Sequence, residues 1–419
     1  MSHSVIGKSF PRNDAISQVT GRLVFGDDLV RPDMLYAKAL RSKYAHAKLL
    51  DVDTSAAERA AGVKAVITSK DILHNRFGVT HQDQPVLADD KVRYFGDAVA
   101  VVAATSLDAA EEALGLIKVD YEPLPAVFDP IEAMKEDSPK VHGASNIASH
   151  LTTRFGDIAQ GWKEADVIIE EKIVSSRVEH VHLEPHSAWA ESTNGELRVI
   201  TSTQKPFGCA ADLSKIFRIP MHKIKVATCA VGGSFGGKYE VTVEPYVALL
   251  AMKTGRLVKM SFTREEEFEA STTRHPYIMK YKSGLKIDGT LVARQIDIIS
   301  DSGAYVSLGA ATLTKACIHA SGPYRVPHVN IDGCLVYTNN PVGGAMRGFG
   351  VTQLGFASEV HMDTIAAEMG IDPVELRLKN AFVDNSSLPT GQVLEVVSLK
   401  ECIKEAVQLS GWKKEIKIL

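Results

Sequence analysis

The sequence has few cysteines and no long apolar run, and each absence excludes a class of protein. Its five cysteines are odd in number and lie far apart. They therefore suit neither the disulfide framework of small secreted domains nor an iron–sulfur cluster, which needs closely grouped cysteines. No run of about eighteen apolar residues could cross a bilayer, and residues 1–12 lack the apolar block of a signal peptide. We expect a cytoplasmic protein without membrane contact.

The chain also lacks a strong charge bias and a dinucleotide fingerprint. Lysine and arginine number 47 against 51 acidic residues, for a formal net charge of -4. No basic cluster alternates with aromatics, so nucleic acid is not expected as a partner. No fingerprint for flavin or nicotinamide binding is present either. If the chain is a redox enzyme, its electron carriers must lie on other subunits.

A length of 419 residues with 45% hydrophobic content predicts two or three domains with substantial cores. Short strands and helices alternate over residues 35–127. Within this region, a strand at residues 97–104 is followed by a helix with Thr105 as its expected N-cap. Residues 129–150 are rich in proline, glycine and polar residues, and they predict a linker.

Beyond residue 150 the pattern is rich in strands. We expect strands at 167–174, 197–203, 224–230, 257–263, 278–287 and 291–300, and helices at 210–217, 243–253 and 358–369. Asp372 before Pro373 predicts the N-cap of a further helix. Ser398 with Glu401 predicts a capping box for the last helix. These patterns together predict an α+β fold.

Residues 231–240, VGGSFGGKYE, contain four glycines in six residues between a strand-like and a helix-like run. Glycines let a backbone approach a ligand closely and turn its N–H groups toward it, so an anionic ligand is expected. The stretch from Gly232 to Lys238 also fits a phosphate-binding P-loop. However, Tyr239 stands where that loop needs a serine or threonine to hold magnesium. A P-loop nucleotide-binding protein is therefore the less favoured alternative.

A second loop, residues 343–353 or GGAMRGFGVTQ, repeats this design of glycines with one aromatic and one cation. Two such loops about a hundred residues apart predict a large ligand held from two sides. Together with Ser202-Thr203-Gln204, the loops resemble the molybdopterin-binding subunit of the xanthine dehydrogenase and aldehyde oxidase family of molybdenum hydroxylases. The resemblance covers residues 14–407, nearly the whole chain.

This resemblance implies an α/β hammerhead domain at residues 14–128, the linker at 129–150, and the first half of a molybdopterin-binding domain at 151–419. The implied cofactor is molybdenum bound to molybdopterin, expected in its dinucleotide form. In this family no protein side chain ligates the metal, so no protein metal ligand is expected. The neighbouring His180, His182 and His186 are therefore expected to be structural.

The resemblance also implies roles for single residues. Gln204 would be the catalytic residue that hydrogen-bonds a molybdenum oxygen, since its amide can both donate and accept. The cofactor would be bound by Gln204, Gly233, Phe235, Gly236, Arg347 and Gly348, and the substrate by Phe349, Lys315 and Tyr239. Taken singly, each residue also fits an ordinary role, such as a strand-end amide, a surface cation or a core aromatic.

Departures from the family pattern narrow the range of expected substrates. Purine-oxidising members carry a glutamate where this chain has Tyr239 and an arginine where it has Lys315, so xanthine is disfavoured. Carbon monoxide dehydrogenases carry a copper-binding cysteine where it has Gly348, so carbon monoxide is disfavoured as well. We expect an N-heteroaromatic acid, whose carboxylate Lys315 would attract and whose ring Phe349 would face.

The family's catalytic glutamate comes from a second cofactor domain, and no Gly-Val-Gly-Glu motif occurs before Leu419. This layout resembles the nicotinate dehydrogenase branch, in which the molybdenum subunit is split into two chains. The resemblance implies a partner chain that supplies the glutamate, separate iron–sulfur and FAD subunits, and hydroxylation of a nicotinate-like ring with water as the oxygen source. The alternatives are an aldehyde or purine dehydrogenase subunit and a non-catalytic fragment without its partner.

Overall fold

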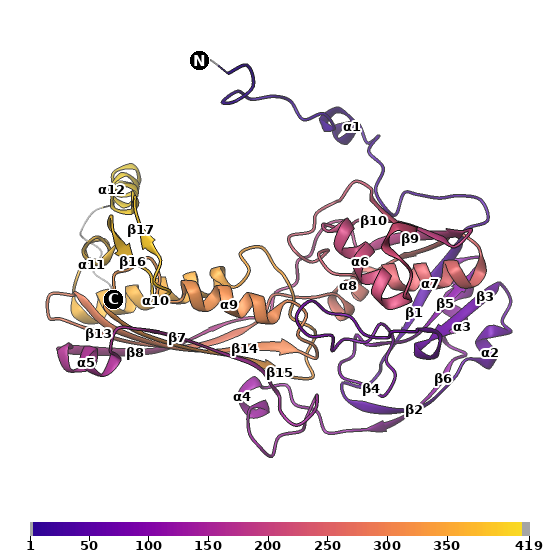
Figure 1. Cartoon of the computed structure of the whole chain (residues 1–419), viewed down its shortest axis with the longest axis horizontal. Helices are drawn as coiled ribbons and strands as arrows, with labels where there is room; N and C mark the ends of the chain where they lie inside the picture. The colour runs from indigo at the N-terminus through magenta and orange to yellow at the C-terminus, as the bar shows by residue number, and fades with distance from the viewer. Residues whose placement is uncertain (1–2, 413–419) are drawn as a thin grey trace.

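The computed structural model describes residues 3–412 and has two lobes, each built on one large β-sheet (Figure 1). The first lobe contains a seven-stranded sheet in the order β11-β10-β9-β12-β1-β5-β3. Its strands are β1 (Leu35–Arg41), β3 (Val63–Thr68), β5 (Ala98–Ala104), β9 (Ser187–Thr193), β10 (Glu196–Thr201), β11 (Ile224–Thr228) and β12 (Val258–Ser261). The predicted α+β class is confirmed.

The seven-stranded sheet joins strands from both predicted domains. Strand β1 pairs in parallel with β12, with Leu35 opposite Val258. Helices α6 (Pro206–Phe217) and α7 (Glu244–Thr254) pack on this sheet and bury apolar side chains such as Leu213 in its core. Two stretches that are far apart in sequence therefore share one core, and the sequence pattern does not reveal this. The exact domain limits stay predictions.

Helix α3 (Leu107–Leu114) covers the other face of β5, and its cap differs from the predicted one. Ser106, not Thr105, accepts the hydrogen bond from the Ala109 N–H. The N–H of Thr105 donates to the carbonyl of Gly62, so the extended chain of β5 continues one residue further than expected. A small sheet, β4-β2-β6, completes this end of the lobe with β2 (Ala47–Asp53), β4 (Lys91–Val92) and β6 (Lys118–Pro123).

Residues 129–150 connect the lobes but pack as part of the second one. They contain α4 (Pro130–Ala133), whose N-cap Asp129 accepts hydrogen bonds from two backbone N–H groups, and the start of β7 (Ile147–Phe155). Val141 is fully buried in the core of the second lobe. Proline and glycine here shape a fixed turn-rich path, where composition alone predicted a linker.

The second lobe contains a five-stranded sheet in the order β7-β15-β14-β13-β8. Its other strands are β8 (Val167–Ser175), β13 (Tyr277–Leu285), β14 (Leu291–Gly303) and β15 (His328–Tyr337). Helices α9 (Gly309–His319), α10 (Val351–Met369) and α11 (Pro373–Asn380) lie over one face, and α5 (Ile158–Glu164) lies on the other (Figure 1). The predicted cap of α11 is confirmed, because Asp372 accepts from the N–H groups of Val374 and Glu375.

The predicted capping box of the last helix is wrong. Ser398 precedes α12 (Leu399–Ser410), but its side chain makes no capping hydrogen bond. Its backbone lies at φ -98° and ψ 19°, and an N-cap side chain needs an extended backbone to reach back to the first turn. The remaining elements are α1 (Ala15–Val19), α2 (Ser55–Glu58), α8 (Arg264–Ala270), the hairpin β16 (Ser386–Ser387) with β17 (Val393–Leu394), and two short 3-10 turns at Ser69–Asp71 and Met221–Lys223.

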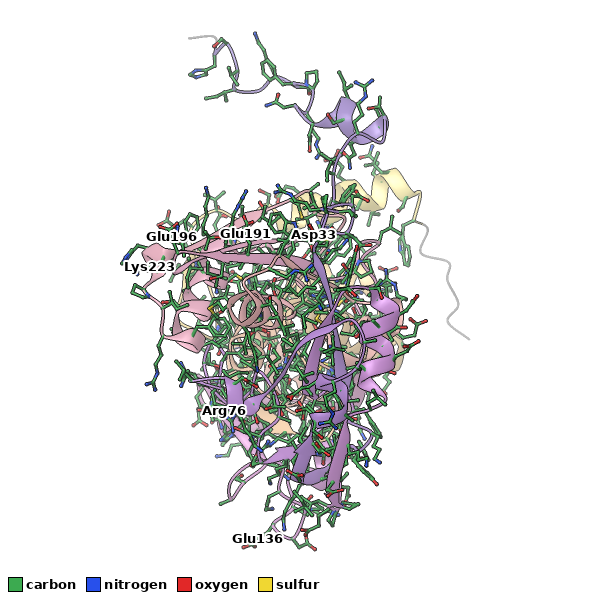
Figure 2. All side chains as sticks on the ribbon, turned by 90° about the vertical axis from the view of Figure 1, so that its right-hand side faces the viewer. Asp33, Arg76, Glu136, Glu191, Glu196 and Lys223 are labelled. Carbon is green, nitrogen blue, oxygen red and sulfur yellow. The ribbon has the colours of Figure 1, made fainter. Side chains whose placement is uncertain are left out.

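The surface is charged, as Figure 2 shows for Glu136, Glu196 and Lys223 at the periphery of the fold. Of the cysteines, Cys209 and Cys317 are buried in the two cores, and Cys402 is exposed. No helix between residues 3 and 412 combines the length and the apolar character that spanning a bilayer requires.

Candidate active site between the two glycine loops

The two glycine loops meet where the lobes join. The first loop follows β11 and leads to α7, and the second follows β15 and leads to α10. The Arg347 N–H donates to the carbonyl of Phe235 at 2.8 Å, which ties the loops together. Between them lies a cavity of about 480 Å³, lined by Gln204, Phe235, Gly236, Tyr239, Leu308, Ala345, Met346, Arg347, Gly348 and Phe349. It includes all of the predicted site residues except Gly233 and Lys315.

Both loops use the same unusual backbone conformation. Phe235 and Phe349 each have φ of 52°, and each precedes a glycine with positive φ, Gly236 at 111° and Gly350 at 92°. A bulky residue in this left-handed region costs about 1–3 kcal/mol, and such strain is concentrated at functional sites. The close contact also requires glycine, because a Cβ on Gly236 would lie 2.5 Å from the carbonyl oxygen of Ala345. The two loops thus turn two aromatic rings toward one cavity.

The amide of Gln204 has a defined orientation. Its Oε1 accepts hydrogen bonds from the backbone N–H of Gly236 at 3.0 Å and from the hydroxyl of Ser234 at 2.6 Å. A backbone N–H can only donate, so the atom facing it must be the amide oxygen. The Nε2 group then has no acceptor in the described part of the chain. The sequence predicted a side chain able to donate and accept, and the fold leaves only donation for a ligand.

Further donors surround the cavity. The N–H groups of Ala345, Met346 and Gly348 have no acceptor within residues 3–412. Helix α10 begins just beyond, with Gly350 as N-cap and no side chain satisfying its first turn. Unpaired N–H groups and the positive end of a helix together favour phosphate and other anionic oxygens. The site therefore fits a cofactor that carries many oxygen acceptors, as molybdopterin does.

A buried ion pair supports the first loop from beneath. The Nζ of Lys238 lies 2.7 Å from Oε2 of Glu184, and the same oxygen accepts from the N–H of Gly232 at 2.7 Å. Both side chains are buried, Lys238 to 1% exposure. Burial lowers the pKa of Lys238, and Glu184 opposes that shift. Because its ammonium is bonded to Glu184, Lys238 is not free to bind a phosphate, which argues against the P-loop alternative.

The histidine cluster lies beside this ion pair. His186 donates through Nδ1 to Glu267 at 2.9 Å and through Nε2 to the carbonyl of Gly237 at 3.2 Å. Both ring nitrogens donate, as in a charged imidazolium. Burial lowers the pKa of His186, but the carboxylate of Glu267 outweighs it and the net shift is upward. His182, His186 and Glu267 lie close enough to hold a metal ion, but one would have to displace these hydrogen bonds. We interpret the cluster as support for the loop, and the absence of a protein metal ligand stays a prediction.

The structure does not bring the two other predicted site residues to the cavity wall. Gly233 has φ of 95° and packs against His182. A Cβ added at Gly233 would lie 3.2 Å from the Cβ of His182. Lys315 is exposed on α9, whose buried side includes Leu313 and Ala316, and only Leu308 just before this helix lines the cavity. The substrate-binding role of Lys315 stays a prediction that this placement does not support.

Sequence reasoning missed several residues around the site. Leu308, Ala345 and Met346 line the cavity, but their residue types carry no functional signal. Glu267 is distant in sequence from the histidines that it pairs with. Lys205 lies beside Tyr239, and its position directly after Gln204 was the signal that could have identified it.

Comparison with known proteins agrees with this geometry. Residues 141–381 match the family described as the molybdopterin cofactor-binding domain. Residues 20–125 match the a/b hammerhead domain of aldehyde oxidase and xanthine dehydrogenase. The chain belongs to the xanthine dehydrogenase and aldehyde oxidase family of molybdenum hydroxylases. The predicted family, the hammerhead domain and the molybdopterin-binding domain are confirmed.

The relatives differ in length. The nicotinate dehydrogenase large molybdopterin subunit of Eubacterium barkeri is 39% identical over 98% of this chain and 99% of its own length. The xanthine dehydrogenase molybdenum-binding subunit of Escherichia coli O157:H7 is 33% identical over 96% of this chain but only 56% of its own length. Among solved structures, the aldehyde oxidoreductase from Desulfovibrio gigas has a TM-score of 0.92 at 33% identity, covering 96% of this chain and 46% of that one. The chain thus spans the whole of one relative and about half of the other two.

Proposed function

We propose that this chain is the large molybdopterin-binding subunit of a multi-subunit molybdenum hydroxylase that oxidises an N-heteroaromatic acid such as nicotinate. The observation that carries the proposal is the cavity between the glycine loops, which is lined both by Gln204, with its unpaired Nε2, and by Phe349. The nicotinate dehydrogenase subunit of matching length supports the substrate class. Tyr239 supports it too, because a neutral phenol does not repel an acid as a glutamate would.

We assign a different role to each residue of the cavity. When bound, the molybdenum cofactor supplies the two-electron oxidation that adds oxygen from water to an electron-poor ring carbon. Gln204 donates a hydrogen bond to an oxygen near the reacting carbon, and its own oxygen holds the first loop. Arg347 and the free N–H groups of the second loop hold the anionic cofactor. Phe349 faces the flat substrate, where stacking contributes about 0.5–1.5 kcal/mol toward its orientation.

The proposal requires partners. Among the described residues that line the cavity, none is a carboxylate that could act as base, so a second molybdopterin-binding chain would supply the glutamate that removes a proton. Iron–sulfur and FAD subunits would carry the electrons away, and the pterin would be in its dinucleotide form. The similarity to the nicotinate dehydrogenase large molybdopterin subunit, whose name describes one subunit of an enzyme, supports the need for partners.

An aldehyde or purine dehydrogenase subunit is the second candidate, supported by the relatives with those names. The test is to purify the native complex, identify its chains and metals together, and measure turnover of nicotinate, xanthine and an aromatic aldehyde. We expect molybdenum, a second molybdopterin-binding chain and preference for nicotinate. Preference for xanthine or the aldehyde would select the second candidate. Magnesium-dependent nucleotide binding without molybdenum would refute both, and a lone inactive chain would indicate a fragment without its partner.

A further inference from the structure

The position of Lys205 links it to the cavity. Lys205 directly follows Gln204 and precedes α6, and its Nζ lies 4.7 Å from the ring centroid of Tyr239, which lines the cavity. The side chain is only partly buried. Of the carboxylates that the structure describes, none lies within 4.0 Å of this ammonium. Lys205 thus holds its charge against an aromatic face, without an acidic partner, at the edge of the site.

Gly208 in the first turn of α6 leaves space for the Lys205 side chain. A Cβ on Gly208 would lie 2.3 Å from Cε and 2.4 Å from Cδ of Lys205. Glycine is a poorer helix former than alanine, so its presence in this turn calls for a reason. The space that it leaves is occupied by the lysine stem, which is thereby directed toward Tyr239.

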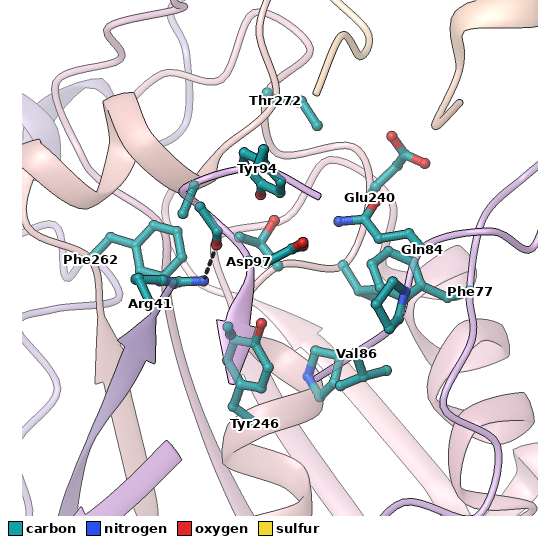
Figure 3. A pocket seen from close by; sticks show the side chains of 18 residues that line it. Arg41, Phe77, Gln84, Val86, Tyr94, Asp97, Glu240, Tyr246, Phe262 and Thr272 are labelled. Carbon is teal, nitrogen blue, oxygen red and sulfur yellow. Dashed lines mark hydrogen bonds between the residues drawn. The ribbon is translucent and has the colours of Figure 1, made fainter. Parts of the chain in front are cut away.

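Two acids, Glu240 and Asp212, lie near enough to Lys205 to interact with its charge. Burial raises the pKa of Glu240 to about 7 and also raises that of Asp212, and Lys205 opposes both shifts. Glu240 accepts a hydrogen bond from the hydroxyl of Ser307 and faces a separate small cavity (Figure 3). Neither acid forms an ion pair with Lys205 within 4.0 Å, so the positive charge of Lys205 is available to an anion that enters the main cavity.

We propose that Lys205 binds the carboxylate of the heteroaromatic acid and so determines the preference for acidic substrates. This inference rests on the proposed function. A lysine ammonium on a flexible stem can leave the weak contact with an aromatic ring for a carboxylate, which it binds as a point charge. Sequence reasoning assigned this role to Lys315, but Lys205 is adjacent to Gln204 and contacts a residue of the cavity wall.

The test compares lysine variants in the purified complex, with nicotinate as the acid and nicotinamide as its neutral analogue. We expect Lys205→Met to raise KM for nicotinate about tenfold or more, the effect of losing one charge-assisted hydrogen bond. KM for nicotinamide should change less than about twofold. Lys215→Met is the matched control, because it removes one exposed positive charge from α6, the helix that follows Lys205, and should leave both KM values unchanged. The proposal would be overturned if Lys315→Met raised KM for nicotinate and Lys205→Met did not.

A second variant separates positioning from folding. Gly208→Ala should raise KM for nicotinate by displacing the lysine stem, while the melting temperature stays the same or rises because alanine favours the helix. An equal loss for acid and amide in Lys205→Met would also overturn the proposal. If the complex turns over neither compound, equilibrium binding of nicotinate decides. Weaker binding to the Lys205→Met complex would support the inference although the proposed function failed, whereas unchanged or undetectable binding would refute it.

Discussion

Replacing Gln204 separates its two functions, since its oxygen holds the first glycine loop and its nitrogen is free to donate into the cavity. In Gln204→Glu, a carboxylate oxygen still accepts from Gly236 and Ser234, but the donor is lost. In Gln204→Ala, both functions are lost. Losing one preorganised donor at a reacting centre costs about 10²–10³ in rate. We therefore expect both variants to lower kcat by that factor.

The two variants should differ in stability. Each hydrogen bond accepted by Gln204 contributes about 1 kcal/mol, so Gln204→Ala should lose about 2 kcal/mol. Unfolding entropy is about 2.1 cal/mol/K per residue, or about 0.9 kcal/mol/K for 419 residues. The melting temperature of Gln204→Ala should fall by about 2 °C, and that of Gln204→Glu should fall by less than about 1 °C.

The assay measures kcat for nicotinate, molybdenum content and melting temperature on the same purified complex. Gln18→Glu on the exposed helix α1 is the control, because it introduces the same charge away from the cavity. Full kcat in Gln204→Glu would show that the donor is not needed. Loss of molybdenum from Gln204→Glu would assign the residue to cofactor retention and remove the catalytic role.

Three further predictions test the support of the site. Lys238→Met leaves the buried carboxylate of Glu184 without its cation, which costs about 3–5 kcal/mol; the melting temperature should fall by about 3–6 °C, and a fall below about 1 °C would contradict the ion pair. Burial raises the pKa of Glu240 to about 7, above its value of about 4.3 in the unfolded chain. The folded protein therefore loses stability as pH rises from about 4.3 through 7, because the buried carboxyl must ionise. The melting temperature of Glu240→Gln, measured relative to that of the unsubstituted chain, should therefore rise between pH 5 and pH 8. A difference that does not change with pH would refute this. Gly236→Ala places a Cβ 2.5 Å from the carbonyl of Ala345 and should lower the molybdenum content of the complex; full content would show that the loops tolerate separation.

Much of the architecture could be predicted because local patterns encode it. The apolar run at β5, the helical pattern of α7 and the Asp372 cap of α11 are all short-range signals, and each is present in the fold. The capping box predicted at Ser398 was wrong, because capping also depends on a backbone conformation that residue types alone do not determine. Ser398 has the residue type of a cap, but its near-helical backbone prevents its side chain from capping.

The family and the two loops could be recognised without coordinates, because closely spaced glycines with a phenylalanine and a cation form a pattern along the chain. How the loops meet depends on the fold, since the hydrogen bond from Arg347 to Phe235 joins segments from different lobes. The fold also fixes which end of the Gln204 amide is free, through the Gly236 N–H that holds the oxygen. It places Lys205 against the ring of Tyr239, which lines the cavity, and Lys315 on an exposed helix face. Side-chain direction depends on packing between distant segments, and no local pattern records it.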